Sequence, residues 1–435
     1  MRDFATSDSP AVQAQLDRLA ALSLPQGRFG LETIRELLAR LGDPQKRLPP
    51  VFHVAGTNGK GSTCAYLRAM LEAQGLHVHV ATKPHLVRYN ERIRIAGELI
   101  SDDELASLLD EVLNLGGDLS PSFFEVTTAA LFLAFSRHPA DACVIEVGLG
   151  GRFDATNVLD RPAVCGIATL GIDHEAFLLR PEPGTPPEPL ARIAFEKASI
   201  ARPGVALVTQ AYPRIVEAEV IRTAAAHNAP LVMRGRDWWA ETDGHIAYRD
   251  AKGALTLPLP ALAGAHQADN AALAVAMLRH QSEVQVSPEA MATGIAATRW
   301  PARLQLLGDG PLTLLAGNRK VWLDGGHNPD AGLAIARHFA ASPPLHLIIG
   351  MLANKDPAAI VAPLAGMLAS LSIVPAPGHD AHPPEAFARY SMVPVRSFPD
   401  VMSALAALPP GGDVLIAGSL YLAGEMLRLN QEWPD

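Results

Sequence analysis

The stretch that decides the fold is VFHVAGTNGKGSTCAYL, residues 51–67. An apolar run typical of a buried strand meets a glycine-rich turn, and a helix-like pattern follows. In such a turn the backbone N–H groups face inward on an anion, and the following helix adds its positive N-terminal end. The sequence therefore predicts an ATP-binding phosphate loop, in which Lys60 neutralises the β and γ phosphates; its members are Gly56, Thr57, Asn58, Gly59, Lys60, Gly61 and Ser62.

The spacing of this loop is unusual. The common phosphate loop has four residues between its glycines and a Ser or Thr directly after the Lys. Here two residues separate Gly56 from Gly59, and Gly61 stands between Lys60 and Ser62. Glycine-rich turns between a strand and a helix also occur for purely structural reasons, but the run Gly-Asn-Gly-Lys-Gly-Ser after a strand favours nucleotide binding.

Short apolar runs alternate with helix patterns through most of the chain. The runs PPVFHVAG, HVHVAT, DACVIEVG, AVCGIATL and GVALVTQ read as strands, with helical stretches at 63–74 and 124–136. A second set follows: VWLDGG, LHLIIG, LSIVPA and DVLIAGS, with helical stretches at 330–341 and 399–408. Such alternation predicts an α/β fold, with a large P-loop nucleotide-binding domain around a mainly parallel sheet and a smaller Rossmann-like C-terminal domain.

Two proline-interrupted stretches have different meanings. ATRWPARLQ, residues 297–305, separates a helix-like run from a new strand, so we place the boundary between domains 1–298 and 299–435 there. The stretch 178–190 carries five prolines, but the α/β pattern resumes at once, so we expect an exposed loop.

The composition excludes several classes of protein. The 435 residues are 49% apolar and 19% charged, and the net charge of -9 argues against nucleic acid or an anionic membrane as the main partner. Cys64, Cys143 and Cys165 lack a CxxC spacing and are expected to be buried thiols. Without a signal-peptide pattern or an apolar run of about 18 residues, we expect a cytoplasmic monomer that acts on small molecules.

The loop and eleven further motifs together resemble one family. HVAGTNGKGS resembles the nucleotide loop of the folylpolyglutamate synthases and dihydrofolate synthases, relatives of the Mur ligases, and the Gly in GKGS is the folate-type variant. The other matching segments cover nearly the whole chain in the family's order: FGLETI, KPHLVRYNERI, SFFEVTTAA, EVGLGGRFDATN, GIDHEAFL, IAFEKASI, HQADNAALA, PARLQ, LDGGHNPDA, GMLANKD and AGSLYLAGE.

The resemblance implies two Mg²⁺ ions and names their ligands. Glu146 ends an apolar run where a carboxylate would face the phosphates, and hard Mg²⁺ prefers oxygen ligands. Thr82 aligns with a metal-binding hydroxyl of the family, while Ser62 is the hydroxyl next to Lys60; the sequence leaves open which of them binds the first ion.

The second ion depends on His174 and Lys197. His174 matches a metal-binding histidine of the family, and Lys197 matches a lysine that CO₂ converts to a carbamate, an oxygen ligand. That reaction needs the neutral amine, so burial or a nearby cation must lower the pKa of Lys197. The resemblance thus gives Lys60, His174 and Lys197 catalytic roles; taken alone, each of the latter two would read as a structural histidine or a helix-surface lysine.

Other matching segments are expected to hold the substrates. The folate or pteroate acceptor is assigned to Arg28, Phe29, Gly30, Ser122, Phe123, Phe124, Glu125, Arg152, Phe153 and Asp154, although core packing is the alternative for each phenylalanine. Asn270, Arg303 and Asp324 match contacts to adenine, phosphate and ribose of ATP. His327 and Asn328 are assigned to the glutamate cleft, with a turn and helix start as the alternative.

Four departures from the family pattern accompany these matches. Lys83 stands where the family has Ser in SSPHL or TSPHL, and its side chain either points to solvent or adds charge near the phosphates. Residues 175–179 break the family's DHTEFLG pattern, Ala302 replaces the Gly of PGR, and the proline-rich stretch is longer than the usual connection.

The resemblance implies an ATP-dependent ligase that activates a folate or pteroate carboxylate as an acyl phosphate and joins it to L-glutamate. Dihydropteroate as acceptor would give dihydrofolate synthase activity, and a reduced folate would give polyglutamate extension; the sequence separates neither. The alternatives are a Mur-type peptidoglycan ligase, disfavoured by GKGS, SFFE and the short segment before the loop, and a nucleotide-binding homologue without activity.

Overall fold

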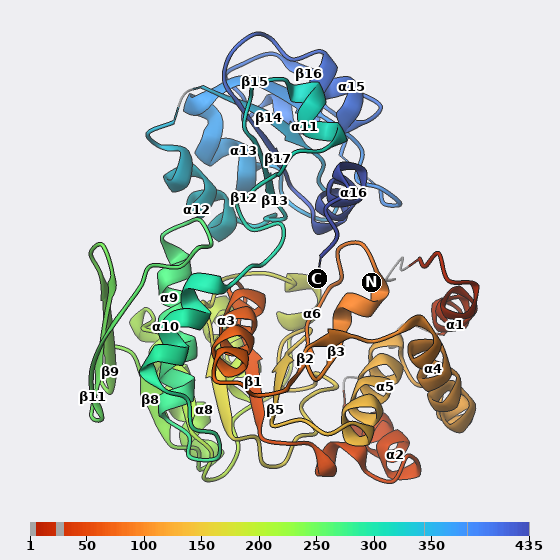
Figure 1. Ribbon diagram of the computed structural model, residues 1–435, viewed down its shortest axis with the longest axis vertical. Helices are drawn as coiled ribbons and strands as arrows, with labels where there is room; N and C mark the ends of the chain where they lie inside the picture. Colours follow the sequence, from red (N-terminus) through yellow and green to blue (C-terminus); the bar gives the residue numbers. More distant parts are fainter. Residues whose placement is uncertain (1–5, 23–29, 343, 381, 435) are drawn as a thin grey trace. The chain divides into compact units, whose positions relative to one another are not determined.

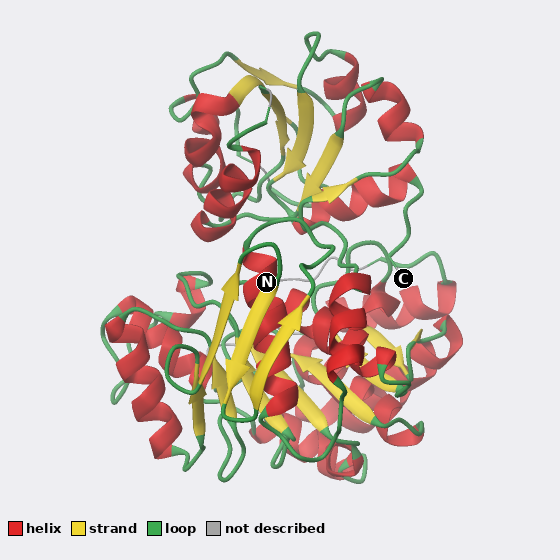
Figure 2. Ribbon diagram, turned by 60° about the vertical axis from the view of Figure 1, so that its left-hand side comes forward, coloured by secondary structure: helices red, strands yellow, loops and turns green. Residues whose placement is uncertain are grey.

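The computed structural model describes residues 6–22, 30–342, 344–380 and 382–434. The chain divides into two compact units. The large unit holds Met1–Pro84, Arg88–Ala261 and Ala268–Thr298; the small unit holds His85–Val87, Leu262–Gln267 and Arg299–Asp435. Each is built around its own sheet flanked by helices (Figure 1, Figure 2), which confirms the predicted α/β class.

The large unit contains a sheet with the strand order β4-β3-β2-β5-β1-β6-β7-β8 in the described part of the chain. The run from β2 to β8 is parallel, whereas β3 and β4 are antiparallel to their neighbours. The central strand β1 is paired along both edges, with β5 and β6, and all five of its residues are buried, as in a parallel strand covered on both faces. The strands are β1 (Val51–Ala55), β2 (Val78–Ala81), β3 (Ile93–Ile95), β4 (Glu98–Leu99), β5 (Ala142–Glu146), β6 (Val164–Ile167), β7 (Leu207–Thr209) and β8 (Leu231–Met233).

Helices cover this sheet and carry some of the candidate residues, among them Lys60, Ser62 and Lys197. One close packing is that of α10 on α3: a Cβ on Gly294 would lie 2.5 Å from the Cα of Met70, so the two helices approach to backbone distance. The helices are α1 (Pro10–Ala20), α2 (Glu32–Arg40), α3 (Lys60–Ala73), α4 (Asp102–Gly116), α5 (Phe123–Arg137), α6 (Glu175–Leu178), α7 (Pro189–Ala198), α8 (Arg214–Ala226), α9 (His266–Arg279) and α10 (Pro288–Ala297), with 3₁₀ turns η1 (Pro44–Arg47), η2 (Tyr89–Arg92) and η3 (Gly117–Leu119).

A small antiparallel sheet in the large unit was not predicted. It consists of β9 (Trp238–Thr242), β10 (Ile246–Asp250) and β11 (Gly253–Leu257), in the order β11-β10-β9. The inward residues of its strands, Trp238 and Tyr248, are buried and their rings stack 5.9 Å apart. The alternation of buried and exposed residues along β10 is that of a sheet with one solvated face.

The small unit has the strand order β12-β13-β17-β14-β15-β16, parallel except for β12. Its strands are β12 (Gln305–Leu306), β13 (Val321–Asp324), β14 (Leu345–Ile349), β15 (Leu368–Ile373), β16 (Val395–Ser397) and β17 (Asp413–Ala417). Its helices are α11 (Pro311–Ala316), α12 (Pro329–Phe339), α13 (Ala358–Leu364), α14 (Glu385–Ala388), α15 (Val401–Ala406) and α16 (Leu420–Asn430), with a 3₁₀ turn η4 (Ala365–Met367).

The departure at Ala302 has a structural consequence. Ala302 has φ 55°, in the left-handed region that an alanine adopts only at a cost, and its side chain is fully buried in the core of the small unit. A glycine at this position, as in the family pattern, would adopt the same backbone without that cost.

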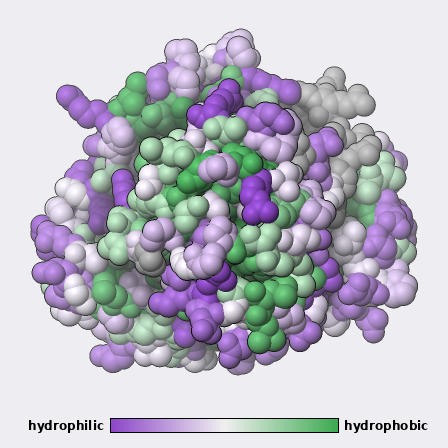
Figure 3. All heavy atoms as spheres, turned by 90° about the horizontal axis from the view of Figure 1, so that it is seen from above, coloured by the Kyte–Doolittle hydropathy of each residue, from purple (hydrophilic) through white to green (hydrophobic). Residues whose placement is uncertain are grey.

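The surface and the cysteines fit the composition. Figure 3 shows hydrophilic and hydrophobic residues interspersed on one face of the molecule. None of the described helices combines the length and the apolar character that a membrane crossing requires. Cys64, Cys143 and Cys165 are buried free thiols, as expected.

Candidate active site

The phosphate loop runs from the end of β1 to the start of α3, and its glycines are required by its conformation. Gly56 and Gly59 have φ values of 154° and 84°. A Cβ on Gly59 would lie 2.4 Å from Oδ1 of Asn270, so the Asn270 side chain packs against the loop itself. Thr57 fixes the loop, because its amide donates to the Thr169 carbonyl at 2.8 Å and its hydroxyl to the Gly171 carbonyl at 2.8 Å.

The first turn of α3 has the features of an anion site. The helix begins at Lys60, three residues earlier than expected, because Gly59 takes the left-handed N-cap conformation. Gly59 provides no side-chain cap, and the first N–H groups of a helix have no partner within the helix. The Lys60 ammonium donates to the carbonyls of Gly56 and Thr57 at 3.1 and 3.2 Å, so it lies over the loop. Ser62 is buried in the same turn.

Glu146 ends β5, the strand next to β1, and pairs in register with Val54 near the end of β1. Its side chain is 3% exposed, and its Oε2 accepts a hydrogen bond of 3.1 Å from the Lys83 amide. Burial raises the pKa of the Cys64 thiol on α3, and the charges of Glu146 and Lys60 also act on it, so both charges lie near this part of α3. The hydroxyl of Thr82 donates to the Glu91 carbonyl at 3.4 Å.

Lys197 is buried, at 4% exposure, so the helix-surface interpretation is wrong. Burial lowers the pKa of Lys197 from 10.5 to about 7; the charge of Lys60 lowers it too, whereas Asp173, Asp154 and Glu196 raise it. Because the charges of Lys60 and Asp173 act on it, Lys197 lies near the phosphate loop and near the segment that carries His174. The amide of His174 donates to Oδ1 of Asp173 at 2.7 Å, and its side chain is 33% exposed.

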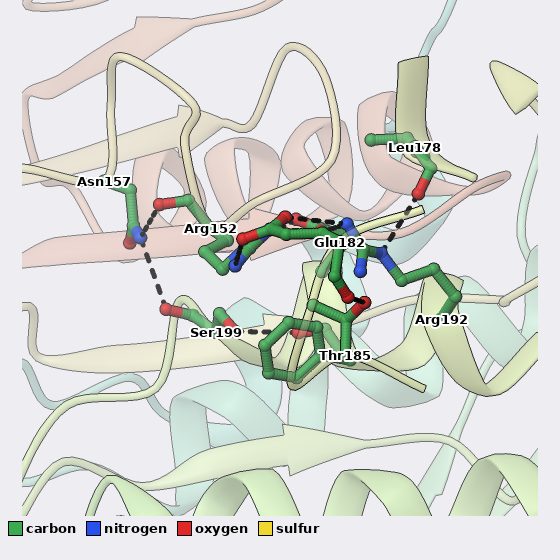
Figure 4. A network of polar contacts seen from close by, with 9 residues as sticks. Arg152, Asn157, Leu178, Glu182, Thr185, Arg192 and Ser199 are labelled. Atoms are coloured by element: carbon green, nitrogen blue, oxygen red, sulfur yellow. Dashed lines mark hydrogen bonds and ion pairs between the residues drawn. The ribbon is translucent and has the colours of Figure 1, made fainter. Parts of the chain in front are cut away.

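The proline-rich stretch is tied to this region by a network of ion pairs (Figure 4). Arg152 donates through Nη1 to Oε1 of Glu182 at 3.0 Å and through Nη2 to Oε2 of Glu182, and it also binds both carboxylate oxygens of Glu196. Arg192 donates from Nη2 to Glu182 at 3.1 Å and to Glu196 at 2.9 Å, and from Nε to the Leu178 carbonyl at 3.1 Å. Much of the stretch is exposed, as predicted, and Glu182 anchors it to α7, the helix of Lys197.

Two of the segments assigned to the acceptor are held by contacts between their own residues. Ser122 and Glu125 form a capping box at the start of α5, in which the Ser122 hydroxyl and amide donate to Glu125 at 2.8 Å each. Phe123 is partly buried against the core, whereas Phe124 and Phe153 are each 36% exposed. The Arg152 guanidinium lies 4.2 Å from the Phe153 ring centroid. Arg28 and Phe29 lie outside the described residues, and Gly30 precedes Leu31, the N-cap of α2.

Asp154 is held by the loop that follows β5. Its Oδ2 accepts from the amides of Gly148 and Leu149 at 3.0 and 2.9 Å, and its Oδ1 accepts from the amide and hydroxyl of Thr156. Burial alone would raise the pKa of Asp154, but the charge of Lys83 and these hydrogen bonds lower it by more. The pKa of Asp154 is therefore below its usual value. A charged carboxylate is therefore fixed in this loop.

The remaining predicted ATP and glutamate residues lie in the small unit. Asp324 accepts from the amides of Leu304 and Gly326 at 2.8 and 2.6 Å, so it fixes the PARLQ segment that contains Arg303. Asn328 is the N-cap of α12 and accepts from Ala331 at 3.0 Å, as the helix-start alternative expects. His327 pairs with the Gly325 carbonyl at 3.0 Å through Nδ1.

Comparison with known proteins identifies the family. The chain is 33% identical over 414 residues to folylpolyglutamate synthase of Lacticaseibacillus casei, covering 90% of this chain and 92% of that protein. It is 37% identical to dihydrofolate synthase/folylpolyglutamate synthase of Escherichia coli (strain K12), covering 80% of this chain and 76% of that protein. The chain belongs to the folylpolyglutamate synthase/dihydrofolate synthase family.

A solved structure supports the same assignment. It is a bifunctional folylpolyglutamate synthase/dihydrofolate synthase with Mn, AMPPNP and L-glutamate bound, at a TM-score of 0.83 and 31% identity, covering 98% of this chain and 99% of that chain. A scan against protein-family models found no matching model.

The residues present fit the metal that this family implies. Among the described residues, no group of three or more His, Cys, Asp or Glu side chains is arranged to hold a metal ion. Mg²⁺ bound with a nucleotide needs only one or two carboxylates, because phosphate oxygens and waters supply its other ligands. The buried carboxylate of Glu146 and the hydroxyl of Ser62, in the first turn of α3, supply the few protein ligands that such an ion needs.

The sequence did not predict a role for Glu182 or Arg192, and it left the direction of the Lys83 side chain open. Glu182 and Arg192 carried no motif, although five prolines in 178–190 marked the segment as constrained. Lys83 was recognised as a departure, but its direction was open. The structure places it half-buried, with the charges of Asp154 and Glu146 acting on it.

Proposed function

We propose that this protein is an ATP-dependent ligase that joins L-glutamate to dihydropteroate, to reduced folates or to both. The observation that carries the proposal is the phosphate loop with Lys60, set at the start of α3 beside the buried carboxylate of Glu146. A nucleotide site with this spacing, in a chain of this family, fits activation of a carboxylate by ATP.

The chain's own residues suit phosphoryl transfer. The acceptor carboxylate attacks the γ-phosphorus of ATP, the bond to the β-phosphate oxygen breaks, and ADP leaves behind an acyl phosphate. The amine of L-glutamate then displaces phosphate and forms the amide. Lys60 and the N–H groups of the first turn of α3 stabilise the charge on the transferring group and are already in place before the reaction.

The divalent metal is assigned to Glu146 and Ser62. Mg²⁺ bound there supplies positive charge to the nucleotide phosphates. We favour Ser62 over Thr82, because the Thr82 hydroxyl donates to a backbone carbonyl whereas Ser62 lies in the same first turn of α3 as Lys60.

Lys197 is proposed to carry a carbamate and, with His174, to bind a second metal ion. Its burial favours the neutral amine that reacts with CO₂, and its lowered pKa agrees with that requirement. The carbamate would give the neutral Lys197 a negative charge, which the nearby Lys60 ammonium would balance.

The acceptor is assigned to the segments around Gly30, Phe124, Phe153 and Asp154. The two half-exposed rings offer faces to a flat heterocycle, and the fixed carboxylate of Asp154 places a negative charge next to Phe153 in the same loop. Arg152 is better described as a positioning residue, because Glu182 and Glu196 occupy four of its donor contacts.

The domain roles are part of the proposal. Residues 1–298 would bind ATP and the acceptor, whereas residues 299–435 would contribute Arg303 and Asp324 to ATP and His327 and Asn328 to glutamate. We also propose a monomer in the cytoplasm as the working form.

The test is turnover of purified protein with Mg-ATP, L-glutamate and one acceptor at a time. Glutamate-dependent ADP release with dihydropteroate alone indicates a dihydrofolate synthase, with tetrahydrofolate alone a folylpolyglutamate synthase, and with both a bifunctional enzyme. No release with either acceptor would contradict the proposal, provided that the protein is folded.

A further inference from the structure

Lys83 lies at the end of β2, between the two halves of the proposed site. Its amide donates to Oε2 of Glu146, the residue assigned to the metal and phosphates. Its side chain is half-buried and lies against Gly148. Of the two possibilities that the sequence left open, it therefore does not simply point to solvent. A Cβ on Gly148 would lie 3.3 Å from Cδ and 3.6 Å from Nζ of Lys83.

The same point on Gly148 locates Asp154, the residue assigned to the acceptor. A Cβ there would lie 3.2 Å from Oδ2 of Asp154. The Lys83 ammonium and the Asp154 carboxylate therefore flank one glycine. Gly148 has no side chain to separate them, so the glycine is what admits the lysine to this position.

Asp154 does not use up the donors of Lys83. The Asp154 oxygens already accept four hydrogen bonds from Gly148, Leu149 and Thr156. No hydrogen bond or ion pair joins Nζ of Lys83 to any residue in the described part of the chain. An ammonium group has three donors, so those of Lys83 can bind a ligand.

Charges of both signs surround Lys83. The pKa of Lys83 is lowered, mainly by burial and also by the charge of Arg92, whereas the carboxylates of Asp154 and Glu146 raise it. The nearby His53 is neutral, because burial lowers its pKa to about 3. Two fixed carboxylates thus flank an ammonium that has donors to spare.

We propose that Lys83 binds the carboxylate of the acceptor and the phosphoryl group that this carboxylate attacks. The inference rests on the proposed function and deepens it, by adding a substrate-contacting residue that the family pattern, with Ser at this position, does not contain. Lys83 lies between the residue assigned to the phosphates and the residue assigned to the acceptor, where the two substrates must meet.

The role is electrostatic. The reaction brings a carboxylate against a phosphate, and the repulsion between two anions opposes their approach. A cation already positioned at their junction offsets that repulsion and costs no reorganisation during the reaction. Lys83 keeps its proton throughout: the new bond joins the carboxylate oxygen to phosphorus, and the electron pair of the broken bond leaves with ADP.

The first experiment measures binding without turnover. The probes are pteroate and its carboxamide, titrated into the protein with AMPPNP and Mg²⁺ present. We expect the unaltered protein to prefer the carboxylate by about ten- to a hundredfold, the worth of one charge-assisted hydrogen bond. Lys83→Met should lose most of this preference and Lys83→Arg should keep part of it. Lys320→Met, at an exposed lysine of the small unit, is the matched control and should behave like the unaltered protein.

The second experiment measures turnover. Lys83→Met should lower kcat by about a hundredfold or more, as removal of a preorganised charge does, and Lys83→Arg should restore part of the loss. If Lys83 only balances Asp154, then adding Asp154→Asn to Lys83→Met should restore kcat, and that result would overturn the inference. An unchanged carboxylate preference in Lys83→Met would overturn it as well.

The outcomes separate this inference from the proposed function. If the unaltered protein releases no ADP with any acceptor, the proposed function fails, whereas the carboxylate preference still tests Lys83. If the unaltered protein is active and a folded Lys83→Met variant matches it in both experiments, only the role of Lys83 fails. Circular dichroism and thermal unfolding of each variant establish that it is folded.

Discussion

Glu182→Ala is expected to loosen the segment that joins His174 to Lys197. Glu182 is the point where the proline-rich stretch meets Arg152 and Arg192 (Figure 4), and it accepts three hydrogen bonds from them. Without it, both arginines share the single carboxylate of Glu196. Arg192 is only 6% exposed, so its charge would be left under-compensated in a buried setting.

The magnitude follows from the exposure of the partners. A protected charge-assisted hydrogen bond contributes about 1.5–3 kcal/mol, whereas an exposed ion pair contributes about 0–1 kcal/mol. The Glu182 side chain is 41% exposed, so the contribution of each of its contacts to stability is closer to that of an exposed ion pair. We therefore expect the whole set to stabilise the large unit by about 1–2 kcal/mol, equivalent to a fall of about 2–5 °C in Tm.

The assay combines thermal unfolding with hydrogen exchange. The Tm is compared with that of Glu241→Ala, which removes the same charge from an exposed site on β9 and should change stability by less than about 0.5 kcal/mol. Amide exchange should speed up in residues 175–196 and not in β9–β11, because the loss opens one segment locally.

A double-mutant cycle isolates the contact itself. Combining Glu182→Ala with Arg192→Met should cost less than the sum of the two single losses, because the second change removes a charge that the first left unpaired. Additive losses, or a Tm for Glu182→Ala equal to that of Glu241→Ala with unchanged exchange, would refute the reasoning.

Three further outcomes concern the site itself. Lys60→Ala should abolish turnover because it removes the charge over the phosphate loop, and near-normal kcat would contradict the loop assignment. Glu146→Ala should raise the Mg²⁺ concentration needed for half-maximal activity by about tenfold or more, and an unchanged metal titration would exclude the ligand role. The pKa of Lys197 falls to about 7 on folding, so the unfolded chain holds a proton that the folded chain lacks between about pH 7 and 10.5. The free energy of unfolding should therefore rise with pH across that window in the unaltered protein relative to Lys197→Met, and parallel pH profiles would contradict the lowered pKa.

Much of the parallel sheet could be predicted because its strands are continuous apolar runs. Strands such as Ala142–Glu146 and Leu345–Ile349 are buried along their whole length, so their composition alone identifies them. The start of α3 was misplaced because the prediction followed the apolar pattern, whereas the helix begins where Gly59 turns the backbone. Backbone conformation set that boundary, and the glycine was its only local sign.

The antiparallel sheet β9–β11 was missed although a signal existed. Its strands have only five residues each, buried positions alternate at the start of β9 and along β10, and Asp243-Gly244 lies in the turn between these two strands. Asp-Gly between alternating strands is a strong short-range sign of a hairpin. The regular α/β pattern on either side favours further parallel strands over a hairpin.

The ion-pair network could not have been predicted from local pattern. Glu182 lies 30 residues from Arg152 in the sequence, and nothing in either neighbourhood specifies that they meet. Gly151 allows this arrangement. A Cβ there would lie 2.5 Å from the Glu196 carbonyl oxygen and 3.0 Å from the Lys197 Cα. Because glycine has no Cβ, the loop that carries Arg152 can pack directly on α7. Close approach of backbones is a tertiary property, and a glycine in a sequence signals it without naming the partner.

The charges around Lys197 and Lys83 suggest why a divalent metal should be required. The carboxylates of Asp173, Asp154, Glu146 and Glu196 act on these two lysines, together with the cations Lys60 and Arg92. Glu196 is already paired with Arg152 and Arg192. With Lys197 neutral, the cations of Lys60, Lys83 and Arg92 do no more than balance the other three carboxylates. A carbamate on Lys197 would add a negative charge. ATP brings several more and the acceptor carboxylate another, so the protein's own cations cannot compensate both substrates. The lysine at position 83 would reduce this deficit without removing it, so Lys83→Ser should increase the dependence of turnover on Mg²⁺.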